Sequence, residues 1–133
     1  MPCNLTTPLA SLTAINGQTN LFDLSISATS GLTGKGIVVV IKRSLFDADN
    51  AATTLVLGTS PRSGVTVSAQ TDTAITAVLT VTGANTATLG LGEGVIHAAY
   101  HYSVSLVEGA VLYPVGDGSL TLQRVAAGSG VLG

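Results

Sequence analysis

Apolar and polar residues alternate along most of this chain, and the pattern is clearest over residues 98–123. Between residues 98 and 106 the even positions hold alanine, tyrosine, valine or leucine, whereas the odd positions hold alanine, histidine or serine. A period of two residues is typical of a β-strand that buries one of its faces. Residues 108–109 then predict a turn, residues 110–113 a returning strand, and the glycines within 116–118 a second turn before a last strand.

The same period predicts strands in the preceding part of the chain. Residues 20–29, 65–70 and 75–82 alternate apolar with polar side chains, and residues 53–57 predict a shorter strand. Residues 37–41 are consecutive isoleucines and valines, which is typical of an inner strand covered on both faces. The result is an all-β chain of about seven or eight strands, as expected of an antiparallel β-sandwich.

Residues 83–94 interrupt the alternation just before the last strands. Asn85 is suited to capping a single helical turn, with Leu89 directed inward. A tyrosine that opens a strand after such a corner often bonds back across the turn. Either Tyr100 or Tyr102 is therefore predicted to have this structural role.

The two ends of the chain lack the pattern, so the sandwich is predicted to span residues 20–125. Residues 1–19 contain leucines without a clean period, interrupted by proline and glycine, and predict an extended arm. This arm is either a strand of the same sheet or a segment that docks on a neighbouring subunit. Residues 126–133 predict a flexible C-terminal tail. The predicted assembly contacts are Leu5, Leu9, Leu12 and Ile15 in the arm and Val131 and Leu132 in the tail.

Charged residues are unusually scarce in this composition. They make up 9% of the chain, whereas a typical soluble domain has about 25%. The mean hydropathy is +0.56, although aromatic residues are only 4%. A free monomer with so few charges is poorly protected against self-association. Two interpretations follow: an ordinary β-domain covered by serine and threonine, or a subunit whose faces are covered by neighbours in a large assembly.

Charge and composition also exclude several classes of partner. The formal net charge is −2 and the five basic residues are not clustered, which argues against nucleic-acid binding. No apolar run reaches the roughly 18 residues of a membrane span, and the N-terminal segment lacks the pattern of a secretory signal. The single cysteine excludes an internal disulfide and is compatible with synthesis in a reducing cytosol.

The glycine-rich segment GLTGKG at residues 31–36 invites comparison with a phosphate-binding loop. The spacing of its glycines and lysine differs from that motif. A predicted strand follows the segment, so no helix N-terminus is available to bind phosphate. The same argument excludes a dinucleotide site at the glycines of residues 90–94, and no cofactor is predicted.

No metal site and no catalytic site are predicted either. His97 and His101 share one face of a strand but lie roughly 13 Å apart, too far to bind one zinc ion. One loop could offer three side chains to calcium, or could use them to bond its own backbone. These side chains are Asp47, Asp49 and Asn50. Because nothing marks a nucleophile with its base or an oxyanion hole, the chain is predicted not to be an enzyme.

Three segments resemble a known family, the immunoglobulin-like N-terminal modules of bacteriophage baseplate upper proteins. They are GLTGKGIVVVIKRS from Gly31, TGANTATL from Thr82, and AYHYSVSLVEGAVLYPVGDGSLTLQ from Ala99. Together the resemblance covers about 100 residues, from Leu21 to Arg124. The chain departs from the family at three places: Ala98–Ala99 stand where glycine is usual, Asn85 replaces an acidic residue, and no long receptor-binding region follows the module.

The resemblance implies an immunoglobulin-like antiparallel β-sandwich in a non-enzymatic virion structural protein. Such a protein would be made in the host cytoplasm and would join subunits in a tail, baseplate, fibre attachment or capsid decoration. Its expected partners are other virion proteins and copies of itself, with no nucleic acid and no membrane. The main alternative is a glycan-binding adhesion domain, for which Tyr100, Tyr102 and Tyr113 are the candidate stacking residues. A secreted or scaffold immunoglobulin-like domain with no viral role is a further alternative.

Overall fold

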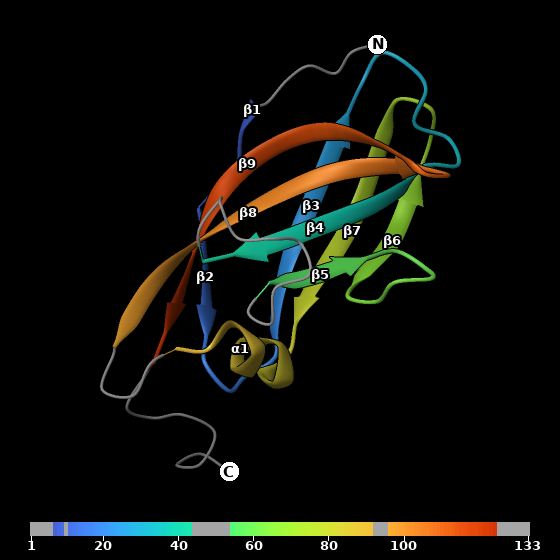
Figure 1. The fold of residues 1–133 in the computed structure, drawn as a ribbon. Coiled ribbons are helices and arrows are strands. Elements are labelled where there is room, and N and C mark those ends of the chain that lie inside the picture. The colour runs from blue at the N-terminus through green and yellow to red at the C-terminus, as the bar shows by residue number, and fades with distance from the viewer. Residues whose placement is uncertain (1–6, 10, 44–53, 92–95, 125–133) are drawn as a thin grey trace.

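Figure 1 shows the computed structural model, which describes residues 7–9, 11–43, 54–91 and 96–124. Over these residues the chain forms nine strands and one short helix. The strands are β1 (Thr7–Pro8), β2 (Leu12–Ile15), β3 (Asn20–Ser27), β4 (Gly36–Lys42), β5 (Leu55–Gly58), β6 (Val65–Gln70), β7 (Ala74–Val81), β8 (His97–Glu108) and β9 (Val111–Gln123), and the helix is α1 (Gly83–Leu89).

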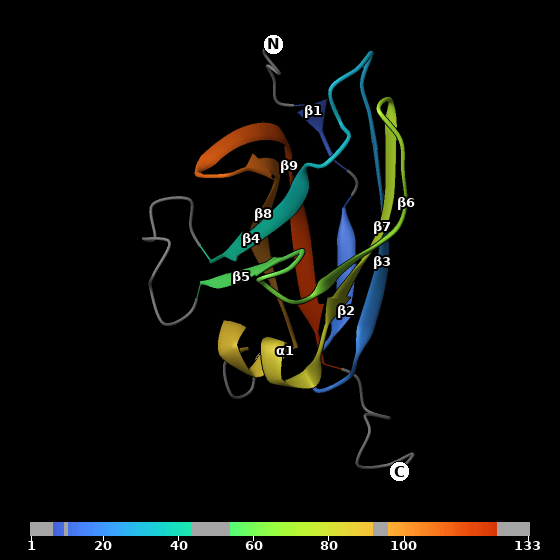
Figure 2. The same ribbon diagram turned by 90° about the vertical axis from the view of Figure 1, so that its right-hand side faces the viewer.

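The strands form two sheets that lie face to face, as the edge-on view in Figure 2 shows. The larger sheet has the order β1-β9-β8-β4-β5, with β2 also paired to β9, and the smaller sheet has the order β3-β7-β6. Neighbours within each sheet are antiparallel, except that β1 and β2 run parallel to β9. The order of the second to ninth strands around the two sheets is that of an immunoglobulin-like sandwich. The predicted all-β sandwich is confirmed.

The core lies between the two sheets and follows the alternation of the sequence. Its inward side chains are Tyr100, Tyr102, Val104 and Leu106 on β8, and Ile75, Ala77, Leu79 and Val81 on β7. On β4, Val38 is 4% exposed and Val39 is 0% exposed, although they point to opposite faces. The predicted inner strand is confirmed, because β4 lies between β5 and β8.

The described part of the predicted arm belongs to the sandwich. Strand β2 pairs with β9 from Leu12 opposite Leu120 to Ile15 opposite Gln123, and Ala14 between them is fully buried. The backbone N–H of Leu9 donates a 2.8 Å hydrogen bond to the carbonyl of Asp117. The structure therefore shows the strand of the same sheet, and the sandwich does not begin at residue 20. The physical reason is that the edge of β9 offers unpaired backbone groups, which β1 and β2 satisfy.

Strand β9 corrects a second prediction, because the glycines within 116–118 make no turn. Gly118 lies inside the strand, directly opposite Tyr102 of β8. A Cβ atom on Gly118 would lie 2.7 Å from the Cε1 atom of the Tyr102 ring, so only glycine leaves room for that ring. The glycine signal came from this close approach and not from a change of chain direction.

Helix α1 closes one end of the sandwich, and its N-cap is Thr82. The Thr82 hydroxyl accepts a 3.1 Å hydrogen bond from the Asn85 N–H, and the Asn85 side chain accepts a 2.9 Å bond from the Thr82 N–H. Asn85 thus completes a capping box instead of serving as the cap. Leu89 is fully buried, as predicted, and its carbonyl accepts a 3.4 Å hydrogen bond from the Tyr100 hydroxyl. Tyr100 therefore has the corner role predicted for one of the two tyrosines.

Candidate interaction site at the loop end

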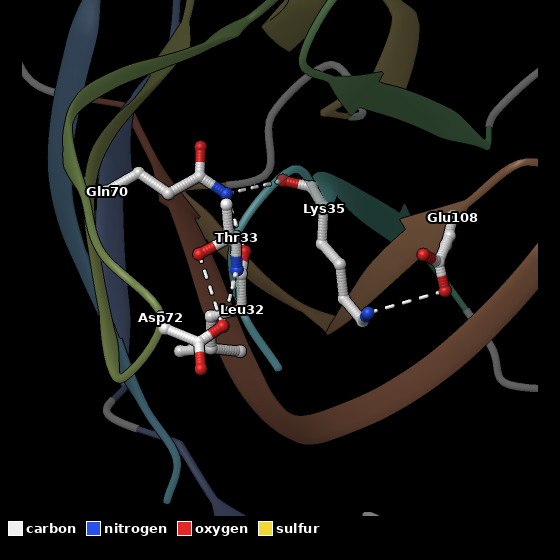
Figure 3. A network of polar contacts seen from close by, with 6 residues as sticks. All are labelled: Leu32, Thr33, Lys35, Gln70, Asp72 and Glu108. Atoms are coloured by element: carbon white, nitrogen blue, oxygen red, sulfur yellow. Dashed lines mark hydrogen bonds and ion pairs between the residues drawn. The ribbon is translucent and has the colours of Figure 1, made fainter. Parts of the chain in front are cut away.

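The opposite end of the sandwich carries the main candidate site, which we call the loop end. Here loop 28–35 between β3 and β4 meets the β6–β7 turn and the β8–β9 hairpin. Figure 3 shows the polar contacts that join these three segments. They come from parts of the chain that lie far apart in the sequence, so folding alone brings them together.

The smaller sheet holds loop 28–35 from one side. The Gln70 side-chain amide donates hydrogen bonds of 2.7 Å to the Leu32 carbonyl and 3.0 Å to the Lys35 carbonyl. The Leu32 N–H in turn donates a 3.1 Å bond to the backbone carbonyl of Asp72. Because the Leu32 side chain is also buried, with 2% exposed, the second half of the loop is anchored to the smaller sheet.

The glycine-rich loop binds a carboxylate of its own chain. Asp72 Oδ1 accepts hydrogen bonds from the N–H (3.4 Å) and hydroxyl (3.1 Å) groups of Thr33. The backbone of Gly31 is the largest cause that lowers the pKa of Asp72, followed by the bonds from Thr33. Gly31 has a φ of +90°, a conformation that favours glycine and turns successive N–H groups toward one anion. The segment that resembles a phosphate loop thus holds an internal anion, Asp72.

The last residue of this loop, Lys35, is a cation. Lys35 Nζ is 3.3 Å from Glu108 Oε1 on the β8–β9 hairpin, and it lies 5.5 Å from the centroid of the Tyr113 ring. The Lys35 side chain is 18% exposed and that of Glu108 is 60% exposed. An ion pair this exposed adds little to stability, about 1 kcal/mol or less, so its importance lies in where it places the two charges.

A cavity of about 300 Å³ opens between loop 28–35 and the hairpin. Most of its lining is apolar, with the Lys35 side chain at one wall. The lining residues include Ala28, Ser30, Leu32, Lys35, Leu106 and Tyr113. The hairpin beside the cavity also exposes two large apolar side chains, Val111 (51%) and Leu112 (53%).

Both outer faces of the sandwich are almost free of charge. Asp23 is the only charged residue in the three strands of the smaller sheet. In the six strands of the larger sheet, the charged residues are Lys42, Glu108 and Asp117. On the smaller sheet, serine, threonine and alanine occupy most of the exposed positions.

Three of the six residues predicted as assembly contacts lie within the described sandwich, where they are partly buried. Leu9 and Leu12 are partly buried and pack against the core, and Ile15 is half-buried in β2. Much of their apolar surface is therefore already used within the chain. Leu5, Val131 and Leu132 lie outside the described residues.

The tyrosines proposed for glycan stacking are mostly unavailable. Tyr100 and Tyr102 are each 3% exposed, and burial raises the pKa of the Tyr102 hydroxyl. Tyr113 is half-buried, and the Lys35 ammonium group lies over its ring. A sugar could reach only the remaining surface of Tyr113.

The candidate metal ligands form no cluster in the described parts of the chain, where no three histidine, cysteine or acidic side chains come together. His97 and His101 are both exposed on β8, as predicted. Asp47, Asp49 and Asn50 lie outside the described residues. Among the helices of the described ranges, none has the length and apolar character needed to cross a membrane.

Sequence reasoning missed the loop end as a site. Periodicity assigns Glu108 only to a turn and gives no signal that Gln70 and Asp72 support a loop about 40 residues earlier. The weak signal was the segment GLTGKG itself, whose glycines require a left-handed backbone at Gly31 and Gly34. What that backbone binds depended on the fold.

No family model matches this sequence, and no curated protein matches it. Among solved structures, one similar chain comes from parallel homodimers of the extracellular domains of the voltage-gated sodium channel β4 subunit, reported to explain its role in cell–cell adhesion (12% identity, 94% of this chain and 91% of that chain, TM-score 0.41). Others are the periplasmic chaperone SfaE (8% identity, 86% and 53%, TM-score 0.39) and a sodium channel β subunit studied for multimeric cell-adhesive interactions (12% identity, 94% and 98%, TM-score 0.38). The assignment of a β-sandwich rests on the strand order of the two sheets in this chain and not on these similarities.

Proposed function

We propose that this chain is a non-enzymatic structural protein of a bacteriophage virion, in which it joins subunits. Its partners would be copies of itself and other virion proteins, in a tail, baseplate, fibre attachment or capsid decoration. The observation that carries the proposal is the scarcity of charge on both outer faces of the sandwich.

Charge-free faces suit contacts between proteins for a physical reason. Burying an unpaired charge is costly, whereas small hydroxyl and apolar side chains can be covered at low cost when their hydrogen bonds are met. The central parts of protein interfaces are accordingly depleted of charged residues. On the smaller sheet the single carboxylate, Asp23, lies on the edge strand β3, so the central strand β7 offers an uncharged surface.

Glycan binding is a weaker alternative for this structure. Glycan-binding domains ordinarily expose aromatic side chains for sugar stacking, whereas two of the three tyrosines of this chain are buried in the core. A glycan array that shows specific binding abolished by Tyr113→Ala would favour the alternative over assembly.

The test places a charge in the centre of the smaller outer face. Thr76 is exposed on β7, so Thr76→Lys should leave the fold intact but introduce an unpaired ammonium group into any contact made there. The matched control is Ser63→Lys, in the exposed turn before β6. Particles purified from cells that make each variant are analysed by quantitative mass spectrometry.

We expect the wild-type chain and Ser63→Lys in the particles, and at least about tenfold less of Thr76→Lys. Circular dichroism of the purified variants checks that both are folded. Particles that contain none of the wild-type chain would refute the virion role. Equal incorporation of both variants would show that the smaller face is not a contact surface.

A further inference from the structure

We infer that two copies of this chain pair through the loop end, each inserting Val111 into the loop-end cavity of the other. The inference deepens the proposed function and rests on it, because it names one contact by which copies associate. Three properties of the loop end support it: the size of the cavity, the position of Val111, and the arrangement of the two charges.

The cavity is small and mostly apolar, which suits an aliphatic side chain. Its volume of about 300 Å³ is at the lower limit of pockets that bind small molecules. Leu32, Leu106 and Tyr113 supply apolar walls, and the ammonium group of Lys35 already has Glu108 and the Tyr113 ring as partners. An entering aliphatic group therefore meets apolar surface without stripping water from an unpaired charge.

Val111 projects from the hairpin on the same face as the cavity. It lies opposite Glu108 in the β8–β9 ladder, and Tyr113 lies opposite Leu106 two positions further along. Residues two apart on a strand share a face, so Val111 is on the side of Tyr113 and Leu106, which line the cavity. With 51% of its surface exposed, Val111 is free to enter a second copy.

The charges make the contact complementary to itself. Because Glu108 is the cross-strand neighbour of Val111, a partner that inserts its Val111 also brings its carboxylate toward Lys35 at the cavity wall. Figure 3 shows Lys35 and Glu108 of one copy extended toward each other at this end. In a two-fold contact each copy supplies one ammonium and one carboxylate, so both ion pairs can form between the copies and no like charges meet.

The decisive experiment mixes two charge-reversed variants. Lys35→Glu replaces the Lys35–Glu108 pair by two carboxylates beside the cavity, and Glu108→Lys replaces it by two ammonium groups, so each variant alone should repel its own kind. A mixture of the two restores both ion pairs across the contact, although it cannot restore the ion pair within either copy. Sedimentation equilibrium and native mass spectrometry measure the dimer in each sample.

We expect a concentration-dependent dimer for the wild-type chain and at least about tenfold weaker dimerisation for each variant alone. The equimolar mixture should form the mixed dimer with an affinity near that of the wild type. Val111→Asp should also abolish the dimer, whereas the control Ile96→Asp, just before the far end of β8, should not. Ile96 is a fair control because it is 69% exposed.

The outcomes separate this inference from the proposed function. A wild-type chain that stays monomeric at about millimolar concentration, or a mixture that fails to associate, overturns the loop-end contact even if particles contain the chain. A mixed dimer formed by a chain that is absent from particles would uphold the contact and refute the virion role.

Discussion

Replacing Gly118 by alanine tests the packing of β8 against β9 most directly. The added Cβ atom would lie 2.7 Å from Cε1, 2.9 Å from Cζ and 2.9 Å from the hydroxyl oxygen of Tyr102. Carbon atoms in contact prefer separations of about 3.5–4.0 Å, so either the ring or the strand must move by about an ångström. Tyr102 is 3% exposed, and its neighbours leave little space for that movement.

The expected magnitude combines two opposing effects. Overpacking of this kind costs about 1–3 kcal/mol. The loss of glycine from the unfolded chain returns about 0.4–1 kcal/mol, because the backbone of Gly118 does not have a positive φ. Gly118→Ala should therefore lower the free energy of unfolding by about 0.5–2 kcal/mol, measured by urea unfolding with circular dichroism.

A second background isolates the contact with the ring. In Tyr102→Leu the atoms closest to the new methyl group are absent, so Gly118→Ala should there be neutral or slightly stabilising. The difference between the two backgrounds is the coupling energy of a double-mutant cycle. If Gly118→Ala is equally destabilising in both backgrounds, the ring is not the reason for glycine at this position.

Three further predictions test other parts of the fold. Val39→Asp should unfold the domain, because it places an unpaired carboxylate in a fully buried site at a cost of several kcal/mol; a soluble variant with an unchanged melting temperature would contradict this. Hydrogen bonds lower the pKa of Asp72 in the folded state. The support that Asp72 gives to loop 28–35 should therefore be complete above pH 3.8 and should be lost as the pH falls through the lower pKa of the folded state. NMR of the Thr33 amide would follow this loss, and Asp72→Asn should give the weakened state at neutral pH. Thr82→Ala should lower the free energy of unfolding by about 0.5–2 kcal/mol, because it removes one half of the capping box. Thr88→Ala is the control in the same helix, and equal effects of the two substitutions would refute the role of the cap.

The alternation of side chains predicted the larger strands because each buries one face and exposes the other. It predicted β4 as an inner strand, because Val38 and Val39 are both apolar although they point to opposite sides. It failed where a residue type has two uses. Glycine within residues 116–118 suggested a turn, whereas Gly118 provides room for a ring from a neighbouring strand.

The site was less accessible to sequence reasoning than the fold. Lys35 and Glu108 are 73 residues apart, and their proximity depends on the pairing of β4 with β8. The arm was equally ambiguous, since leucines without a period suit both a short edge strand and a docking segment. Pairing with β9 decides between them through backbone hydrogen bonds, which leave little trace in the sequence.

The parallel pairing of β1 and β2 with β9 has a mechanical consequence. The first described strand and the last run side by side in the same direction, so the chain enters the sandwich at one end and leaves at the other (Figure 1). Tension applied at Thr7 and Gln123 would pull these neighbours in opposite directions along their length. The six paired positions would then bear the force together, in shear, instead of separating one after another.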